Sequence, residues 1–227
     1  MQECQTKIGN EAIVLAEDQN EVYIGDVDIF LTLFGFRRSE ALYMQPVTAY
    51  QGVPAYQAIY GGYAMFVGAE FDYEIRKEEV VRRLAGQFIF GVQLGWSEVY
   101  NMSPLLDHSN DDLVLYIQKI NSAKRVANSY FVHGRVMREL PHQTHLPPES
   151  VISMPWLSAD GSSLIIPILT VHSEGKYNVK MTLDLSKYGF DNKESDKFFN
   201  LNKLSAYEGQ NPEFMGSFIG KEIKIDI

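Results

Sequence analysis

The sequence predicts an α/β half, residues 1–140, followed by an antiparallel β-sandwich, residues 141–227. The first half alternates short apolar runs with amphipathic segments, which is typical of βα repeats around a parallel sheet. The second half consists of short runs rich in β-branched residues, separated by turns that contain glycine. The pattern changes in the proline-containing stretch 141–148, where we place the boundary between the two parts.

Short apolar runs mark the expected strands of the first half. They lie at 12–16, 26–34, 55–60, 63–68 and 88–96, the last of which reads FIFGVQLGW. Amphipathic segments, KEEVVRRLAGQ at 77–87 and the stretch 111–131, separate these runs and are the expected helices.

The stretch 111–131 shows the clearest helical pattern. Asn110 precedes it, Asp111 and Asp112 begin it, and together they supply an N-cap and negative charge at the helix start. Its exposed face is expected to carry Lys119, Lys124 and Arg125, so we predict a surface helix packed on a sheet. The apolar residues that recur every three or four positions are Leu113, Tyr116, Ile117, Ile120, Ala123, Ala127 and Tyr130.

Strand and turn signals alternate in the second half. Asp160-Gly161 and Glu174-Gly175 are typical of turns, and YNVKMTLDL at 177–185 alternates apolar with polar residues, as a half-buried strand does. The final stretch, GKEIKIDI, predicts a return to strand. We expect Trp156 to fill the core of the sandwich.

The length of the first half limits its architecture. A complete (β/α)₈ barrel takes ~250 residues, whereas residues 1–140 hold only three or four strand–helix units. The first half is therefore either a small open α/β layer or the last part of a barrel whose first half is missing.

Composition argues against several classes of function. The formal net charge of −9 is spread along the chain, which argues against nucleic acid as a partner. The single cysteine, Cys4, cannot form an internal disulfide or a multi-cysteine metal site. No signal peptide opens the chain and no window reaches the ~18 to 20 apolar residues of a membrane helix, so we expect no membrane partner. A secreted or periplasmic location would require a longer precursor.

We expect no cofactor and no metal ion. The pair His142 and His145 in HQTH has a spacing that binds zinc on a helix, but Pro141, Pro147 and Pro148 predict an extended linker there. Motifs for a P-loop, a dinucleotide fold, a serine-hydrolase elbow and an HExxH zinc site are all missing from the sequence.

Five short motifs occur in a characteristic order. AIVLAEDQNEVYIGDVDIFLTL, VPAYQAIYGGYAMFVG and GQFIFGVQLGWSEV are followed by VISMPWLSADGSSLIIPI and LDLSKYGF. This order resembles the C-terminal part of a group of bacterial glycoside hydrolase-like proteins that are related to the α-N-acetylgalactosaminidase type. Many members of that group are domains of unknown function. The resemblance implies that residues 1–140 are the C-terminal part of an incomplete (β/α) barrel, and that residues 141–227 are a β-sandwich accessory domain.

The resemblance also suggests catalytic residues. In that group a carboxylate just after the strand that corresponds to AIVLAED belongs to the active site, commonly as the general acid. Glu17 and Glu21 both match and are alternatives. Loops at the carboxyl ends of barrel strands form the site, and a carboxylic acid placed there protonates a glycosidic oxygen. One of Asp26 and Asp28 is expected to be a helix N-cap and not a ligand contact.

Aromatic residues near expected strand ends are candidates for substrate binding, because sugars stack on flat rings. These are Tyr60, Tyr63, Trp96 and Tyr100, of which Trp96 is the best placed, and Glu98 after it is a third candidate carboxylate. Gly61 and Gly62 stand where the group usually has a His-Asp pair, which departs from the pattern of sugar-binding side chains.

The nucleophile of the group lies on an earlier strand, which would be upstream of Met1. A retaining mechanism needs two carboxyl groups about 5 to 5.5 Å apart, so we expect the isolated chain to be inactive on glycosidic bonds. The alternative hypothesis is a non-catalytic module that binds a carbohydrate or glycan, or that self-associates through open strand edges.

Overall fold

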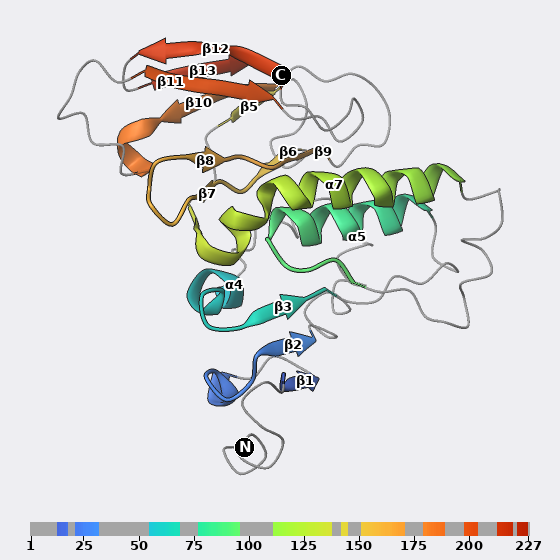
Figure 1. Cartoon of the computed structure of the whole chain (residues 1–227). Coiled ribbons are helices and arrows are strands. Elements are labelled where there is room, and N and C mark those ends of the chain that lie inside the picture. Colours follow the sequence, from blue (N-terminus) through green and yellow to red (C-terminus); the bar gives the residue numbers. More distant parts are fainter. Residues whose placement is uncertain are drawn as a thin grey trace.

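The computed structural model describes residues 13–17, 21–31, 55–68, 77–95, 111–137, 142–144, 151–170, 179–188, 198–203, 213–219 and 222–226 (Figure 1). Figure 1 shows these residues in three layers. Parallel strands of the N-terminal part form one end, two helices lie across the middle, and antiparallel strands of the second half form the other end.

The N-terminal sheet is parallel. Strands β1 (Leu15–Glu17), β2 (Ile29–Leu31) and β3 (Met65–Val67) lie side by side in sequence order, and the apolar runs 12–16, 26–34 and 63–68 therefore contain strands as predicted. A bridge from Val67 to Gln93 aligns a fourth segment in parallel beside β3. Consecutive parallel strands suit both an open α/β layer and part of a barrel, and the barrel stays a prediction.

One face of this sheet is a buried core. The register aligns Ala16, Phe30 and Phe66 across the three strands. The Phe30 and Phe66 rings stack with their centroids 5.8 Å apart, and both side chains are buried. Residues of the opposite parity are more open, since Leu15 is 51% and Met65 is 42% exposed. The burial of one face fixes the register, because a slip of one residue would expose both phenylalanines.

Three α-helices occur among the described residues, α4 (Ala55–Tyr60), α5 (Lys77–Ile89) and α7 (Asp111–His133). Helix α7 confirms the pattern seen at 111–131. The run 55–60, expected as a strand, is helix α4. Helices α5 and α7 pack on each other through a cluster that includes Val80, Leu84, Leu113 and Ile120.

The strand predicted at 88–96 is wrong in its first residues, because Phe88 and Ile89 form the last turn of α5. The helix ends in a Schellman motif. The Gly91 N–H donates to the Phe88 carbonyl and the Val92 N–H donates to the Gln87 carbonyl, while Gly91 adopts a φ of 70°. Phe88 and Ile89 pack into the buried side of the helical layer, and such a continuous apolar run looks the same in a helix and in a buried strand.

The second half forms small antiparallel sheets. The first joins β4 (Arg135–Val136), β7 (Trp156–Leu157) and β8 (Leu164–Ile165), and the second pairs β6 (Val151–Ser153) with β9 (Ile168–Thr170). The third joins β5 (His142–Thr144), β10 (Val179–Asp184) and β13 (Glu222–Asp226), and the fourth pairs β11 (Phe198–Lys203) with β12 (Glu213–Ile219). These sheets stack above the helical layer in Figure 1.

Two local predictions for the second half are confirmed. Gly161 adopts a φ of 70° in the turn between β7 and β8. Along β10, Met181 and Leu183 are buried while Lys180 is exposed, which is the predicted alternation. Strand β10 is followed by a short 3-10 helix, η6 (Leu185–Tyr188).

Trp156 is buried, but not in the interior of a sandwich as expected. Its ring packs edge-on against Phe131 of α7, with centroids 5.1 Å apart. Its Nε1–H donates to the Ile89 carbonyl at 3.0 Å. Trp156 thus joins the antiparallel sheets to the helical layer. Strand β4, which precedes residue 140, pairs with β7, so backbone pairing also crosses the predicted boundary.

Candidate functional site

The two ends of the parallel sheet differ in what surrounds them. Its carboxyl edge holds Glu17, Leu31 and Val67, which are the last residues of β1, β2 and β3 and are aligned in register. Its amino edge holds the 3-10 helix η1 (Glu21–Tyr23) and the end of α4. In Figure 1 the arrowheads of the strands point away from η1 and α4. The sequence-predicted residues are therefore divided between two edges.

The carboxyl edge receives Glu17. The backbone places it as the final residue of β1, next to Leu31 of β2. In parallel α/β folds the site forms at this edge, because the loops that leave the strands converge there. Trp96 and Glu98 follow the fourth parallel segment in sequence, but they lie outside the described residues, as does Tyr100.

Glu21, Tyr60 and Tyr63 lie at the amino edge. The Tyr60 hydroxyl donates a long hydrogen bond of 3.4 Å to the Glu21 Oε2 atom. Tyr60 ends α4, and its carbonyl accepts the N–H groups of Tyr63 and Ala64 just before β3 begins. Glu21 is exposed and the Tyr63 side chain is 73% exposed. Gly61 and Gly62 lie in the turn between Tyr60 and Tyr63.

Asp28 forms hydrogen bonds to both neighbouring segments at the amino edge. One of Asp26 and Asp28 was expected to be a helix N-cap, but the segment that follows them is strand β2, which Asp28 directly precedes. Its carboxylate Oδ2 accepts the Val14 N–H at 2.8 Å, its own N–H donates to the Val14 carbonyl at 2.9 Å, and its carbonyl accepts the Met65 N–H at 2.8 Å. Asp28 thus aligns the starts of all three strands, and Asp26 lies in the turn before it.

The segment 89–95 is held by buried side chains from three elements. Besides Trp156, which binds the Ile89 carbonyl, the Lys124 Nζ of α7 donates to the Val92 carbonyl at 2.7 Å. The Gly95 N–H donates to the Gln87 Oε1 of α5 at 2.8 Å. Because these bonds fix the backbone on both sides of Gln93, they fix the segment that pairs with β3.

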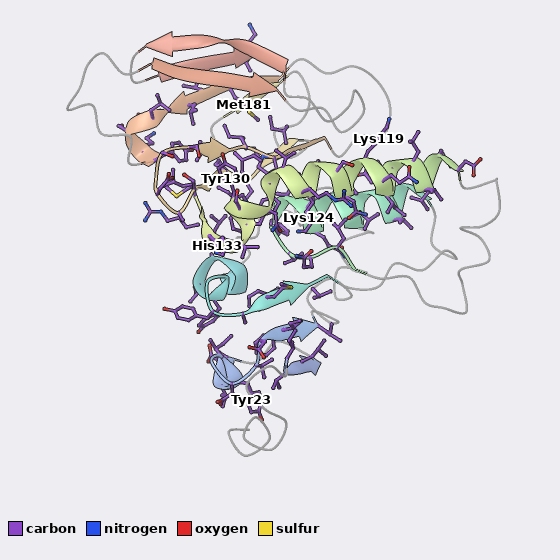
Figure 2. All side chains as sticks on the ribbon, in the orientation of Figure 1. Tyr23, Lys119, Lys124, Tyr130, His133 and Met181 are labelled. Carbon is purple, nitrogen blue, oxygen red and sulfur yellow. The ribbon has the colours of Figure 1, made fainter. Side chains whose placement is uncertain are left out.

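The prediction that Lys124 lies on the exposed face of α7 is wrong. Lys124 is 6% exposed, and its Nζ also lies 5.1 Å from the centroid of the Phe131 ring. In Figure 2, Lys119 and Lys124 leave α7 on different sides. Burial lowers the Lys124 pKa from its ordinary value of 10.5 to about 8. Its spacing from Ile120 and Ala127 places it on the apolar stripe, which was the signal in the sequence.

Gln87 is the other residue that sequence analysis missed. Glutamine is usually exposed, and nothing in KEEVVRRLAGQ singles it out before the packing of α5 is known. In the structure it is fully buried and its Oε1 accepts the Gly95 N–H.

Metal binding finds no support within the described part of the chain, where no three His, Cys, Asp or Glu residues gather around one point. His142 belongs to β5, where it pairs with Met181 of β10, and His145 lies outside the described residues. Of the helices that the described ranges contain, none has the length and apolar character needed to cross a bilayer.

Glu17 thus ends the first strand of a parallel sheet. Comparison with known proteins finds a distant relative. The chain is 26% identical over 217 residues to a protein of Monosiga brevicollis named "Putative glycoside hydrolase 22789". The match covers 79% of this chain and 17% of that protein, so the chain spans only a small part of its relative.

Two further comparisons give no match. No family model matches the sequence, and no solved structure matches it. The similarity therefore supports a relation to a glycoside hydrolase-like protein and leaves the subfamily open.

Proposed function

We propose that the chain is part of a glycoside hydrolase-like protein in which Glu17 is the general acid that protonates the leaving oxygen of a glycosidic bond. The observation that carries this proposal is the position of Glu17 as the last residue of β1, at the carboxyl edge of a parallel sheet. The relative named as a glycoside hydrolase supports the same class of reaction.

Glu17 is preferred to Glu21 because of the edge that each occupies. In a (β/α) barrel the carboxyl edge carries chemistry and the amino edge carries stability. Glu21 lies at the amino edge, where it contacts Tyr60. Trp96 and Glu98 extend the site in this proposal, since they follow the fourth parallel segment at its carboxyl end. The resemblance adds a finer proposal, namely a substrate of the α-N-acetylgalactosaminide type and a second carboxylate from an earlier barrel strand.

A comparison of Glu17→Gln with Glu21→Gln in the complete gene product tests the proposal. Glutamine keeps the size of the side chain and removes the transferable proton. Loss of glycoside hydrolysis in the Glu17 variant alone is expected. Loss of hydrolysis in the Glu21 variant alone would assign the general acid to Glu21 at the amino edge. Full activity in both variants would refute the proposal.

The second candidate function is a non-catalytic carbohydrate-binding or self-associating module. Tyr63 favours glycan contact, because it is an aromatic residue that is 73% exposed. It follows Tyr60, which contacts Glu21, by three residues. Leu15 and Met65 favour self-association, because they lie on the open face of the sheet with exposures of 51% and 42%. The glycan-binding function would be selected by three results together. The wild type binds a glycan without hydrolysing it, Glu17→Gln leaves this binding intact, and Tyr63→Ala weakens it. Dimerisation measured by light scattering, lost on Met65→Glu, would select self-association.

A further inference from the structure

The four most exposed large apolar side chains in the described part of the chain lie at the amino edge of the parallel sheet. They are Ile13, Val22, Ile59 and Tyr63, each between 61% and 75% exposed. The hydrogen bond from Tyr60 to Glu21 joins α4 to η1, and Asp28 binds the segments that begin β1 and β3. These contacts bring the four side chains to one part of the molecule, which we call the amino-edge surface. Apolar side chains gathered in the open mark a place of contact with another molecule.

The charge around the amino-edge surface is of one sign. Glu21, Asp26 and Asp28 lie at this edge, and the described ranges 13–17, 21–31 and 55–68 contain no Lys, Arg or His. An apolar surface among carboxylates fits a partner surface that is apolar and basic. Two amino-edge surfaces facing each other would bring like charges together, so this surface does not fit itself.

Helix α7 carries a surface of the complementary kind. Away from the parallel sheet and its amino edge, Leu115 and Val126 of α7 are the exposed large apolar residues among those described. They are about three turns apart and therefore lie on one face of the helix. Lys119 lies between them, Arg125 is exposed beside Val126, and no Asp or Glu follows Asp112 in α7. We call Leu115, Lys119, Arg125 and Val126 the α7 surface.

The two surfaces do not meet within one chain. In Figure 2, Tyr23 of η1 lies at the end of the molecule where the parallel sheet is, far from Lys119 on the outer side of α7. A contact between the amino-edge surface and the α7 surface therefore requires two copies of the chain.

We propose that the amino-edge surface of one copy docks on the α7 surface of a second copy. The contact is head to tail, because each copy contributes a different surface, and it builds rings or open chains of copies. Apolar side chains supply the attraction, while the opposite charges select the partner surface and its orientation. The inference does not depend on glycosidase activity, and it uses neither Leu15 nor Met65 of the open sheet face.

Charge-reversal variants of the complete gene product test the inference. Glu21→Lys reverses a charge at the amino-edge surface, and Arg125→Glu reverses one at the α7 surface. The double variant carries both changes, so its two surfaces again have opposite charges at these positions. Lys180→Glu, at an exposed position of β10, is the matched control. All four changes concern exposed side chains, and circular dichroism establishes that each variant is folded.

Sedimentation velocity over a range of protein concentrations measures the self-association. We expect the average mass of the wild type and of Lys180→Glu to rise with concentration. In each single variant the Kd of self-association should rise by about five- to tenfold, because an attraction between exposed charges becomes a repulsion. The double variant should recover most of the loss. An equimolar mixture of Glu21→Lys and Arg125→Glu should also associate, because each surface of one variant then meets an opposite charge on the other.

Three results would overturn the inference. A wild type that stays monomeric at every concentration would show that the two surfaces do not bind each other. Self-association that both single variants retain and that Met65→Glu abolishes would assign the contact to the open face of the sheet. Self-association that depends on Glu21 but is unaffected by Arg125→Glu would show that α7 is not the partner surface.

Discussion

The buried Lys124 makes the stability of the fold depend on pH in a defined window. Burial lowers its pKa from 10.5 to about 8, so the folded chain releases this proton more readily than the unfolded chain does. Between these two values the unfolded chain is protonated where the folded chain is not. The free energy of unfolding therefore rises with pH in this window, and below pH 8 the folded state carries the full cost of a buried ammonium group.

The magnitude follows from the two pKa values. A shift from 10.5 to about 8 corresponds to about 3 kcal/mol, at about 1.4 kcal/mol for each tenfold change in proton affinity. Between pH 7 and 10 we expect most of this difference to appear. The variant Lys124→Met removes the titration. It also removes the donor to the Val92 carbonyl, which costs about 1–3 kcal/mol independently of pH.

Urea unfolding followed by tryptophan fluorescence measures this effect at pH 7, 8, 9 and 10. The quantity to compare is the difference in unfolding free energy between the wild type and Lys124→Met at each pH. We expect the unfolding free energy of the wild type to increase relative to that of Lys124→Met as pH rises. Lys180→Met, at an exposed position of β10, is the matched control for the loss of a lysine. A difference that stays constant from pH 7 to 10 would show that the Lys124 ammonium is solvated in the folded chain and would refute the reasoning.

Two further predictions concern contacts that join the layers, and a third concerns the turn between β7 and β8. Gly91→Ala should destabilise the fold by more than Gly161→Ala, although both glycines have a φ of 70°. An alanine in that conformation costs about 1–2 kcal/mol, but only at Gly91 would the Cβ meet the Trp156 ring, at 2.6 Å; equal effects in urea unfolding would contradict the packing. Trp156→Phe should cost about 1–3 kcal/mol because the Ile89 carbonyl loses its donor, and an unchanged unfolding midpoint would argue against that bond. Asp160 accepts hydrogen bonds from the Ser158 hydroxyl and from Ser162, which lowers its pKa from 3.8 to about 2. The wild type should therefore exceed Asp160→Asn in stability above pH 4 and lose that advantage as pH falls towards 2, and an advantage unaffected by acid would contradict the assignment.

Local patterns predicted the regular elements of the fold well. Apolar runs located β1, β2 and β3, and the helical spacing of 111–131 located α7 to within two residues at its end. The alternation along β10 predicted which of its side chains are buried. These signals depend on neighbours in the sequence and need no knowledge of tertiary packing.

The wrong predictions concern residues whose positions depend on tertiary packing. Phe88 and Ile89 extend α5 because they bury against the helical layer, and a run of apolar residues does not distinguish that from a strand. A lysine was assigned to the surface because of its charge, yet Lys124 lies on the apolar stripe of α7 and finds a carbonyl acceptor. The location of Trp156 depends on the contact between the sheets and α7.

The sequence showed the candidate residues but not how they are arranged. Glu17 was proposed because a carboxylate that ends an apolar run is visible in the sequence. The separation of Glu17 from Glu21, Tyr60 and Tyr63 was not visible, because Glu17 and Glu21 are only four positions apart in the sequence although β1 ends at the carboxyl edge and η1 lies at the amino edge. Gln87 could not be found because its contact with Gly95 depends on how α5 packs beside the sheet.

The most direct test of Glu17 as a general acid compares two substrates that differ only in their leaving group. A methyl glycoside needs a proton on its leaving oxygen, whereas a 2,4-dinitrophenyl glycoside leaves readily without one. In the complete gene product we expect Glu17→Gln to slow hydrolysis of the methyl glycoside by about 10²-fold or more and to spare the dinitrophenyl glycoside, with Glu21→Gln close to wild type on both. Equal rates of Glu17→Gln and wild type on the methyl glycoside would contradict the assignment of the acid to the carboxyl edge.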